Sequence, residues 1–223
     1  MNGAHDLGGK HGFGPIDQSQ EENFIHQWEE TVFGLTLTCG MLGQWNLDQS
    51  RSARENTDPA EYLSSTYYEH WLHGLELLLL QKGMITEEEL RSGTNAGKTN
   101  LQAVTPEQVT TIISTGAPTQ LPQRTPGRFQ LNQPVVVNPD NPKHHTRAPS
   151  YVKGVRGMIT HLHGAHIYAD EHAKTGNKVP EHLYSVRFEG TDIWGSAAEP
   201  NSCVYVDLFE SYLTAADTTN PQR

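Results

Sequence analysis

The hydrophobic pattern of this chain changes its period once, at a short proline-rich segment, and this change limits what the chain can fold into. Before the segment, apolar residues recur with the spacing of amphipathic helices. After it, short β-branched and aromatic runs lie between Gly, Pro and Asn. The segment itself, residues 117–127, contains three prolines and no apolar period, as a linker does. We therefore predict an α+β chain with a helical domain at 21–116 and a β domain at 128–223.

Capping signals mark the beginnings of the predicted helices. A helix commonly starts at Ser, Thr, Asp or Asn, with Glu or Gln three residues later. Four such pairs occur in the first half, and two are followed at once by proline, which is favoured at the first helical position. Glycines then provide stops. The pairs are Asp58 with Glu61, Thr66 with Glu69, Thr86 with Glu89 and Thr105 with Gln108, and the stops include Gly83 and Gly116.

Two apolar stripes indicate how the longer helices pack. Residues three or four positions apart share one face of a helix. One stripe belongs to a helix that begins after Asn23 and ends at Gly43, and the other to the helix that begins after Thr66. We expect both stripes to face the core. Their members are Trp28, Val32, Leu35, Cys39 and Leu42 in the first, and Trp71, Leu75, Leu78 and Leu79 in the second.

The second half contains four short runs typical of strands. They cover residues 135–137, 155–159, 183–188 and 204–208, and no long helical pattern separates them. Several short strands within about 100 residues are typical of a small closed sheet. We therefore predict a C-terminal β-barrel of SH3-like size.

The first 20 residues form a segment with neither a helical nor a strand period. They hold five glycines and Pro15, so they cannot build a core alone. Two interpretations are open from composition: an unattached tail, or an extended arm that wraps a partner. A mean hydropathy of -0.60 with 35% hydrophobic residues is low for a self-sufficient globule, and such a composition is common in obligate subunits.

Charge and cysteine content exclude several classes of protein. The 223 residues carry a formal net charge of -10, all of it within residues 1–116, which argues against an electrostatic nucleic-acid or membrane binder. No apolar run approaches the ~20 residues of a membrane span, and the N-terminus lacks a secretory pattern. The two cysteines, Cys39 and Cys203, form no disulfide framework or thiolate motif. We expect a cytoplasmic protein.

Histidines provide the most visible candidate for metal binding. His161 and His163 would share one face of a strand, with His166 close behind. Three neutral imidazoles can bind zinc. The same residues also suit the polar end of a hairpin, and no carboxylate has obvious ligand spacing beside them. The structural interpretation is favoured, and we predict no metal site in this chain.

The chain shows no complete catalytic apparatus of its own. It lacks a nucleophile elbow, a phosphate-binding loop and a dinucleotide fingerprint. Arg51 and Arg147 stand out because the arginine fork suits carboxylate or sulfinate acceptors, although each can equally be a surface or loop arginine. Tyr67 and Trp71 form an aromatic group that is either core or the lining of a small organic pocket.

Taken in order, these motifs closely resemble the β subunits of nitrile hydratases. The resemblance covers nearly the whole chain, and each piece is weak alone. It is carried by the glycine-rich opening; Asn46-Leu47-Asp48 with Arg51; Pro59-Ala60-Glu61-Tyr62-Leu63; Tyr67-Tyr68 with His70-Trp71; His145-Thr146-Arg147; Tyr151 with Gly154 and Gly157; Glu181-His182-Leu183-Tyr184; Trp194-Gly195; and Asp207 with Tyr212.

This resemblance implies a hydro-lyase that adds water to a nitrile to give an amide. In the family the metal, Co(III) or Fe(III), is held by cysteines of the α subunit, two of which are oxidised to sulfinic and sulfenic acids. The resemblance therefore implies an obligate αβ heterodimer, expected as an α2β2 heterotetramer, in which residues 1–20 wrap the α subunit. Similarity at Trp71 to cobalt-type enzymes favours cobalt over iron.

The resemblance also assigns roles to individual residues. Arg51 and Arg147 match the two arginines that donate to the oxidised cysteines, and Tyr67 is the β-subunit residue expected beside the reacting nitrile. His70, Trp71 and Leu47 match pocket or supporting positions. Ser50 departs from the family, which usually has an aromatic there, so pocket shape at that point is in doubt.

Three alternatives accompany this interpretation. A related assembly or activator protein would bind the α chain without catalysis, and a stand-alone barrel module would be a stable monomer. A subunit like those of thiocyanate hydrolase is the third; in that enzyme the two halves are separate chains, whereas here a linker joins them.

Overall fold

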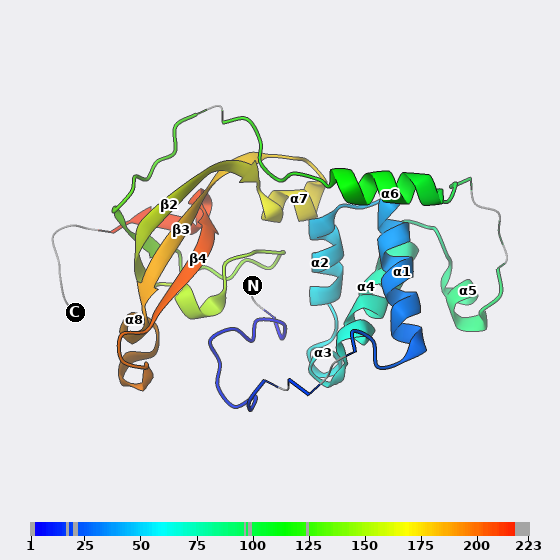
Figure 1. Cartoon of the computed structure of the whole chain (residues 1–223), viewed down its shortest axis with the longest axis horizontal. Helices are drawn as coiled ribbons and strands as arrows, with labels where there is room; N and C mark the ends of the chain where they lie inside the picture. The colour runs from blue at the N-terminus through cyan, green and yellow to red at the C-terminus, as the bar shows by residue number, and fades with distance from the viewer. Residues whose placement is uncertain are drawn as a thin grey trace. The chain divides into compact units, whose positions relative to one another are not determined.

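A computed structural model describes residues 3–16, 18–19, 22–95, 97, 100–123 and 125–216 of the chain. They divide into two compact units. One contains Gly3–His5 and His11–Ala117 and is helical, and the other contains Asp6–Lys10 with the described residues from Pro118 onward and is built on a sheet (Figure 1). Of the segments predicted above, the arm lacks residues 1–2, 17 and 20 among the described residues, and the linker lacks residue 124. Residues 21, 96 and 98–99 of the predicted helical domain and 217–223 of the predicted β domain also lie outside the described residues.

The helical unit has a small core made where α2 and α4 pack together. Its buried apolar residues are Trp45, Ala53, Leu75 and Leu78, so two members of the predicted α4 stripe are confirmed as core. No helix in the described part of the chain is long and apolar enough to cross a membrane. The helices are α1 (Gln27–Met41), α2 (Leu47–Glu55), α3 (Pro59–Ser64), α4 (Tyr67–Gln81), α5 (Glu87–Ser92) and α6 (Pro106–Thr115).

All four predicted helix starts are confirmed by the structure. The Asp58 carboxylate accepts hydrogen bonds from the first turn of α3 at 2.9 and 3.3 Å. Capping boxes are present at Thr66, Thr86 and Thr105. These signals are local, since each cap satisfies backbone N–H groups that the helix itself leaves free. For that reason they could be located from sequence alone.

The predicted core face of α1 is only partly correct. Val32 is buried, but Trp28 and Leu35 are 38% and 48% exposed. Glu29 is buried instead, because its carboxylate folds back to accept from the Ile25 and His26 backbone N–H groups at 2.5 and 3.1 Å. Apolar residues occur on more than one side of α1, so no single face contains all of them.

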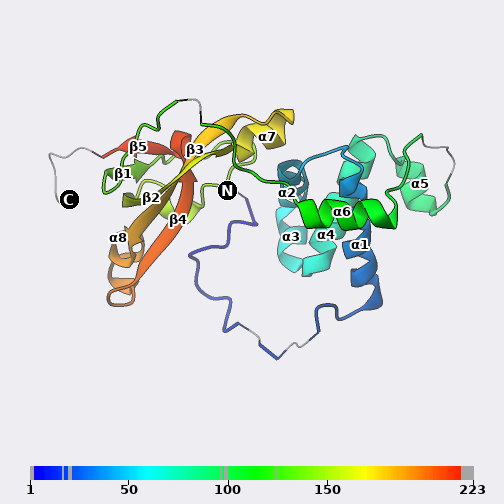
Figure 2. The ribbon, with the colours of Figure 1, turned by 45° about the horizontal axis from the view of Figure 1, so that its top comes forward.

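The second unit is a five-stranded antiparallel sheet in the order β4-β3-β2-β1-β5 (Figure 2). Its core includes Val135, Ile159, Tyr184, Val186 and Phe188, all almost completely buried. The strands are β1 (Pro134–Val137), β2 (Arg156–Ile167), β3 (Pro180–Glu189), β4 (Cys203–Phe209) and β5 (Leu213–Ala215), and short helices α7 (Ala169–Thr175) and α8 (Gly190–Trp194) join them.

The sheet is not closed among the described residues, so the predicted SH3-like barrel is not confirmed. β4 and β5 are its two edges, and no ladder pairs them with each other. Closure requires strand lengths and stagger that match around the ring, whereas β5 has three residues and β4 seven. β2 also shifts register between Ile159 and His161 and again between Leu162 and Gly164.

Two segments outside the strands add to this unit. The Leu121 backbone N–H donates to Ala165 at 2.9 Å, and Ile167 donates to Thr119 at 2.8 Å, so part of the predicted linker pairs with the end of β2. The arm residues 6–10 form the second segment, and they are anchored at Asp6, whose carboxylate accepts from the Ser150 backbone N–H at 2.9 Å.

Aromatic rings hold the glycines of this arm segment. Gly9 has a φ of +71°, and a Cβ there would lie 2.8 Å from Cβ and Cγ of Tyr151. The Trp194 indole donates to the Gly9 carbonyl at 3.1 Å and stacks on Tyr151. Only glycine combines this backbone conformation with so close an approach. The glycine-rich sequence is therefore required at this docking point.

Candidate functional site

Two helices, α2 and α4, carry five of the six residues predicted for the site. Leu47 and Arg51 lie on α2, and Tyr67, His70 and Trp71 lie on the first two turns of α4. Leu47 is 54% exposed at the start of its helix.

A glycine lets these helices pack closely. A Cβ on Gly74 of α4 would overlap the Cγ of Arg54 and lie 3.3 Å from its backbone N. Beside it, Ala53 of α2 and Leu75 of α4 are buried together. Any side chain at position 74 would have to push aside the Arg54 side chain and shift the α2 backbone by a few tenths of an ångström.

Arg51 lies in the second turn of α2, where a carboxylate holds one end of its guanidinium group. Asn46 caps the helix by accepting from the backbone N–H groups of Asp48 and Gln49 at 3.0 and 2.9 Å. Asp48 Oδ1 accepts from Arg51 Nη1 at 3.0 Å; the Asp48 side chain is 9% exposed and that of Arg51 39%. A guanidinium has five N–H donors. Asp48 fixes one end and leaves the group able to serve an outside acceptor.

Tyr67 and Trp71 belong to an aromatic cluster. Their ring centroids are 5.9 Å apart, and the Tyr68 ring lies 5.1 Å from Tyr67 and 6.0 Å from Trp71. Phe24 and Phe33 extend the cluster through contacts at 5.3 and 5.8 Å with Tyr68 and Trp71. Tyr67 is 64% exposed, so its ring lies at the rim. The cluster is therefore partly packed and partly exposed.

Sequence reasoning missed Arg54, which stands next to this cluster. Its guanidinium carbon lies 4.8 Å from the centroid of the Trp71 ring, a cation–π contact. Burial lowers the pKa of Arg54, and the charge of Arg51 acts in the same direction. The available signal was its position three residues after Arg51, which puts both arginines on one side of α2.

The His70 ring packs against α3, whereas the Trp71 ring packs within the aromatic cluster. Its ring stacks on Tyr62 of α3, with centroids 4.1 Å apart and planes inclined by 24°. Its Nδ1 is buried without a hydrogen-bond partner among the described residues. Burial lowers the pKa of His70, and the nearby His73 lowers it further. His70 therefore supports the α3–α4 junction, and the structure does not bring it to the aromatic cluster.

The lowered pKa of His70 predicts a pH-dependent stability. In the unfolded chain this histidine takes up a proton near pH 6.5, whereas folded His70 does so only at a lower pH. The contribution of neutral His70 to the free energy of unfolding is therefore fully present above pH 6.5. This contribution should be lost as the pH falls through the folded pKa. We expect the urea midpoint at 222 nm to fall between pH 7.5 and 5.5, and His70→Phe to flatten this fall. The exposed His11→Gln is the control, and an unchanged profile in His70→Phe would contradict the expectation.

A cavity of about 590 Å³ opens beside Tyr67, between the beginnings of α1 and α4. Rings of Trp28, Tyr67 and Tyr68 line it together with the carboxylate of Glu29. Such a mixture of aromatic surface and a few polar groups suits a small organic molecule.

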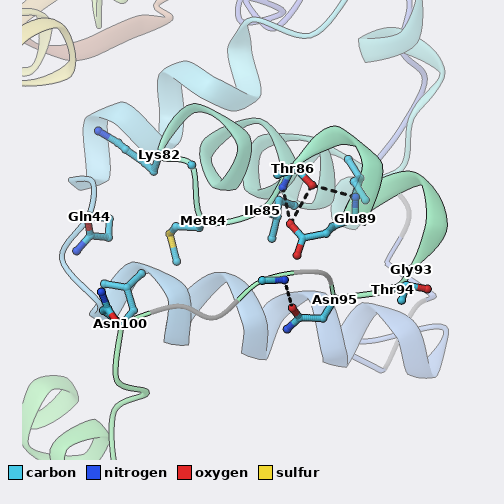
Figure 3. A pocket seen from close by; sticks show the side chains of 14 residues that line it. Gln44, Lys82, Met84, Ile85, Thr86, Glu89, Gly93, Thr94, Asn95 and Asn100 are labelled. Carbon is cyan, nitrogen blue, oxygen red and sulfur yellow. Dashed lines mark hydrogen bonds between the residues drawn. The ribbon is translucent and has the colours of Figure 1, made fainter.

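A second cavity, of about 800 Å³, lies around the turn between α4 and α5 (Figure 3). Lys82, Met84 and Asn100 line it, and none of the predicted site residues does. Its polar groups include Glu89, whose carboxylate is already bonded to Thr86. We assign it no role in the site.

Arg147, the sixth predicted residue, lies in the sheet unit within the connection from β1 to β2. Its backbone N–H donates to the Tyr212 hydroxyl at 3.1 Å. The neighbouring His145, Thr146 and Ala148 are buried, whereas Arg147 is half-buried. The main chain at Arg147 is thus embedded in the unit.

Two members of the histidine triplet are engaged in hydrogen bonds within the sheet unit, and the ring of the third, His161, packs against that of His163 with centroids 4.6 Å apart. His163 Nε2 lies 2.8 Å from Ser185 Oγ and 3.3 Å from Asp207 Oδ1. His166 Nδ1 lies 3.0 Å from Thr119 Oγ1. In the part of the chain that the structure describes, no group of three or more His, Cys, Asp or Glu residues is arranged to hold a metal ion.

Comparison with known families matches the chain along nearly its whole length. The family model for the N-terminal region of the nitrile hydratase β subunit matches residues 1–120, and the model for its C-terminal region matches residues 118–215. The chain belongs to the nitrile hydratase β-subunit family. The helices α2 and α4 lie within the region matched by the first model, and strands β1 to β5 lie within the region matched by the second.

Individual relatives agree with this family. The β subunit of the low-molecular-weight cobalt-containing nitrile hydratase of Rhodococcus rhodochrous is 37% identical over 97% of this chain and 100% of its own length. The β subunit of the cobalt-containing enzyme of Pseudonocardia thermophila is 35% identical, covering 98% of each chain. A nitrile hydratase β subunit of Pseudomonas putida is 37% identical over 97% of this chain and 100% of its own length.

A likeness to a solved structure is weaker. A chain of the apo-enzyme of thiocyanate hydrolase from Thiobacillus thioparus aligns with 59% of this chain and 98% of its own length. The sequence identity is 20% and the TM-score 0.40, which supports no argument about function.

Proposed function

We propose that this chain is the β subunit of a nitrile hydratase and that it completes an active site for hydration of nitriles to amides, together with an α subunit. The observation that carries the proposal is the two-part family match over residues 1–120 and 118–215. The exposure of two residues on α2 and α4 supports it, because the Arg51 side chain is 39% exposed and Tyr67 64% exposed, so both are accessible to a partner. An α2β2 assembly is the expected form.

The two arginines have the chemistry that this role needs. Oxidised cysteines of the α subunit would present anionic sulfur oxygens, and hydrogen bonds to charged groups are each worth roughly 1.5–3 kcal/mol. The planar guanidinium can donate two parallel hydrogen bonds to such an acceptor, which an ammonium cannot. Arg51 is held at one end by Asp48, and Arg147 is fixed through its main chain. The guanidinium of Arg51 and the main chain of Arg147 are therefore oriented before a partner arrives.

Tyr67 is the residue we place nearest the nitrile. It lines the cavity of about 590 Å³, and its exposed ring lies in edge contact with Tyr68. Its hydroxyl can orient the nitrile nitrogen or the attacking water by a hydrogen bond. We assign Trp71, whose ring packs beside that of Tyr67, and Leu47 to shaping the pocket of the assembled enzyme. His70 of α4, which stacks on Tyr62 of α3, is assigned to supporting it.

The metal of the complex is assigned to the α subunit. The described residues offer no set of ligands that fits cobalt or iron, so we derive no step through a metal on this chain. The cobalt-containing relatives favour Co(III), with Fe(III) as the alternative. This chain contributes side chains that orient the reacting groups and shape the pocket.

Co-expression with a nitrile hydratase α subunit tests the proposal directly. We expect co-purification, about one cobalt per αβ pair, and hydration of acrylonitrile to acrylamide measured by chromatography. The β chain alone should show neither stoichiometric metal nor turnover. Stable association without turnover in the metal-loaded complex would instead indicate an assembly protein, and metal retained by the β chain alone would overturn the assignment of the metal.

A further inference from the structure

The segment that carries Arg147 has no secondary structure to hold it. Between the end of β1 and the short 3-10 turn Ser150–Val152, residues 138–149 form neither helix nor strand. A connection of this kind is fixed by the groups to which its backbone bonds and by its buried side chains, here those of His145, Thr146 and Ala148. The position of Arg147 therefore depends in part on those bonds.

One residue bonds to the main chain at both ends of this segment. The Tyr212 carbonyl accepts from the Asn138 backbone N–H at 2.8 Å, and the Tyr212 hydroxyl accepts from the Arg147 backbone N–H at 3.1 Å. Tyr212 lies 65 residues after Arg147 in the sequence, in the turn that joins β4 to β5. It thus ties the Arg147 segment to the edge of the sheet.

The hydroxyl of Tyr212 is itself held in one orientation. It donates to Oδ1 of Asp170, in the first turn of α7. Tyr212 and Asp170 are 7% and 4% exposed. Burial raises the pKa of Tyr212 well above its usual value, and the Asp170 charge raises it further. The hydroxyl therefore remains protonated, donates to the carboxylate, and presents its oxygen to Arg147.

We propose that Tyr212, oriented by Asp170, is a positioning residue that sets the main chain of Arg147 for its role in nitrile hydration. This inference rests on the function proposed above for Arg147. It adds a hydrogen-bonded chain from α7 through the hydroxyl to the arginine, in which neither Tyr212 nor Asp170 touches the substrate. These hydrogen bonds act by fixing the main-chain position from which the Arg147 side chain extends.

Tyr212→Phe in the assembled αβ enzyme tests the proposal. It removes the hydroxyl and retains the ring contacts with Tyr168 and Phe209. We expect kcat per metal-loaded complex to fall about tenfold, with KM nearly unchanged, because orientation acts on the transition state. In an Arg147→Lys background the same change should have little further effect, since the group being positioned is already lost. A purely structural role would lower kcat by the same factor in both backgrounds.

Tyr184→Phe is the matched control. Its buried hydroxyl also donates to a carboxylate, that of Glu210, at 2.6 Å, and this bond includes neither Arg147 nor Tyr212. We expect it to lower thermal stability and leave kcat unchanged. If Tyr212→Phe does not assemble, Asp170→Asn is measured in the same two backgrounds, with a smaller loss of kcat expected only where Arg147 is present.

The outcomes separate the two proposals. Wild-type kcat in Tyr212→Phe, or equal losses in both backgrounds, overturns the positioning role alone. For Asp170→Asn, an unchanged kcat or equal losses do the same. Wild-type turnover in Arg147→Lys overturns the proposed role of Arg147, and the inference about Tyr212 falls with it.

Discussion

Turnover of the assembled enzyme should fall roughly 10- to 150-fold when Arg51 or Arg147 is replaced by lysine. One hydrogen bond to a charged acceptor is worth roughly 1.5–3 kcal/mol, and about 1.4 kcal/mol corresponds to a tenfold change in rate. Lysine keeps the charge but loses the planar fork. The measurement is kcat for a small nitrile per metal-loaded complex, with size-exclusion chromatography to confirm that the αβ assembly persists.

Arg91→Lys provides the control for these two variants. Arg91 pairs with Glu88 on α5, and both side chains are largely exposed, at 74% and 67%. Such surface pairs contribute ~0–1 kcal/mol, so we expect wild-type turnover. An equal loss in Arg91→Lys would show that the effect is not specific to the site. Full activity in both Arg51→Lys and Arg147→Lys would remove the role assigned to these residues.

Gly157→Ala should lower the free energy of unfolding of the sheet unit by ~1–3 kcal/mol, the usual cost of overpacking a core. Gly157 pairs with Val135 of β1. A Cβ there would lie 2.5 Å from Val186 Cγ1 and 2.7 Å from Phe188 Cε1. Both neighbours are completely buried, so they have no free space into which they can move. Urea unfolding followed by far-UV circular dichroism measures the change.

The same substitution at Gly34 is the matched control. Gly34 lies inside α1, and a Cβ there meets nothing within 4 Å. Alanine is favoured over glycine in a helix by about 0.5–1 kcal/mol, so Gly34→Ala should be neutral or stabilising. Equal stability of Gly157→Ala and the wild type would mean that β2 and β3 are less tightly packed than the structure describes.

The parts of the fold predicted from sequence are those governed by local chemistry. Thr66 and Thr105 each satisfy N–H groups within their own first turn. A few adjacent residues therefore determine where each helix begins. The second half of β2 was missed because its histidines and glycine hide the alternation of a strand. The three-residue strand β5 and the pairing of residues 119–121 with β2 give no local signal.

The site shows the same division. Tyr67, His70 and Trp71 can be grouped from the sequence because they share two helical turns, and the role expected of Arg51 comes from the family resemblance. Their separation into an aromatic cluster and a Tyr62 stack depends on how α3 meets α4, which the spacing of one helix does not contain. The bond from Arg147 to Tyr212 spans 65 residues. Contacts of that range are set by topology.

The docking of residues 6–10 has a consequence for how the chain is made. Synthesis proceeds from the N-terminus and domains generally fold in that order, yet Gly9 finds its contacts only at Tyr151 and Trp194. Nearly the whole chain must emerge from the ribosome before residues 6–10 have a binding place. The contacts of this early segment are therefore among the last to form in the nascent protein.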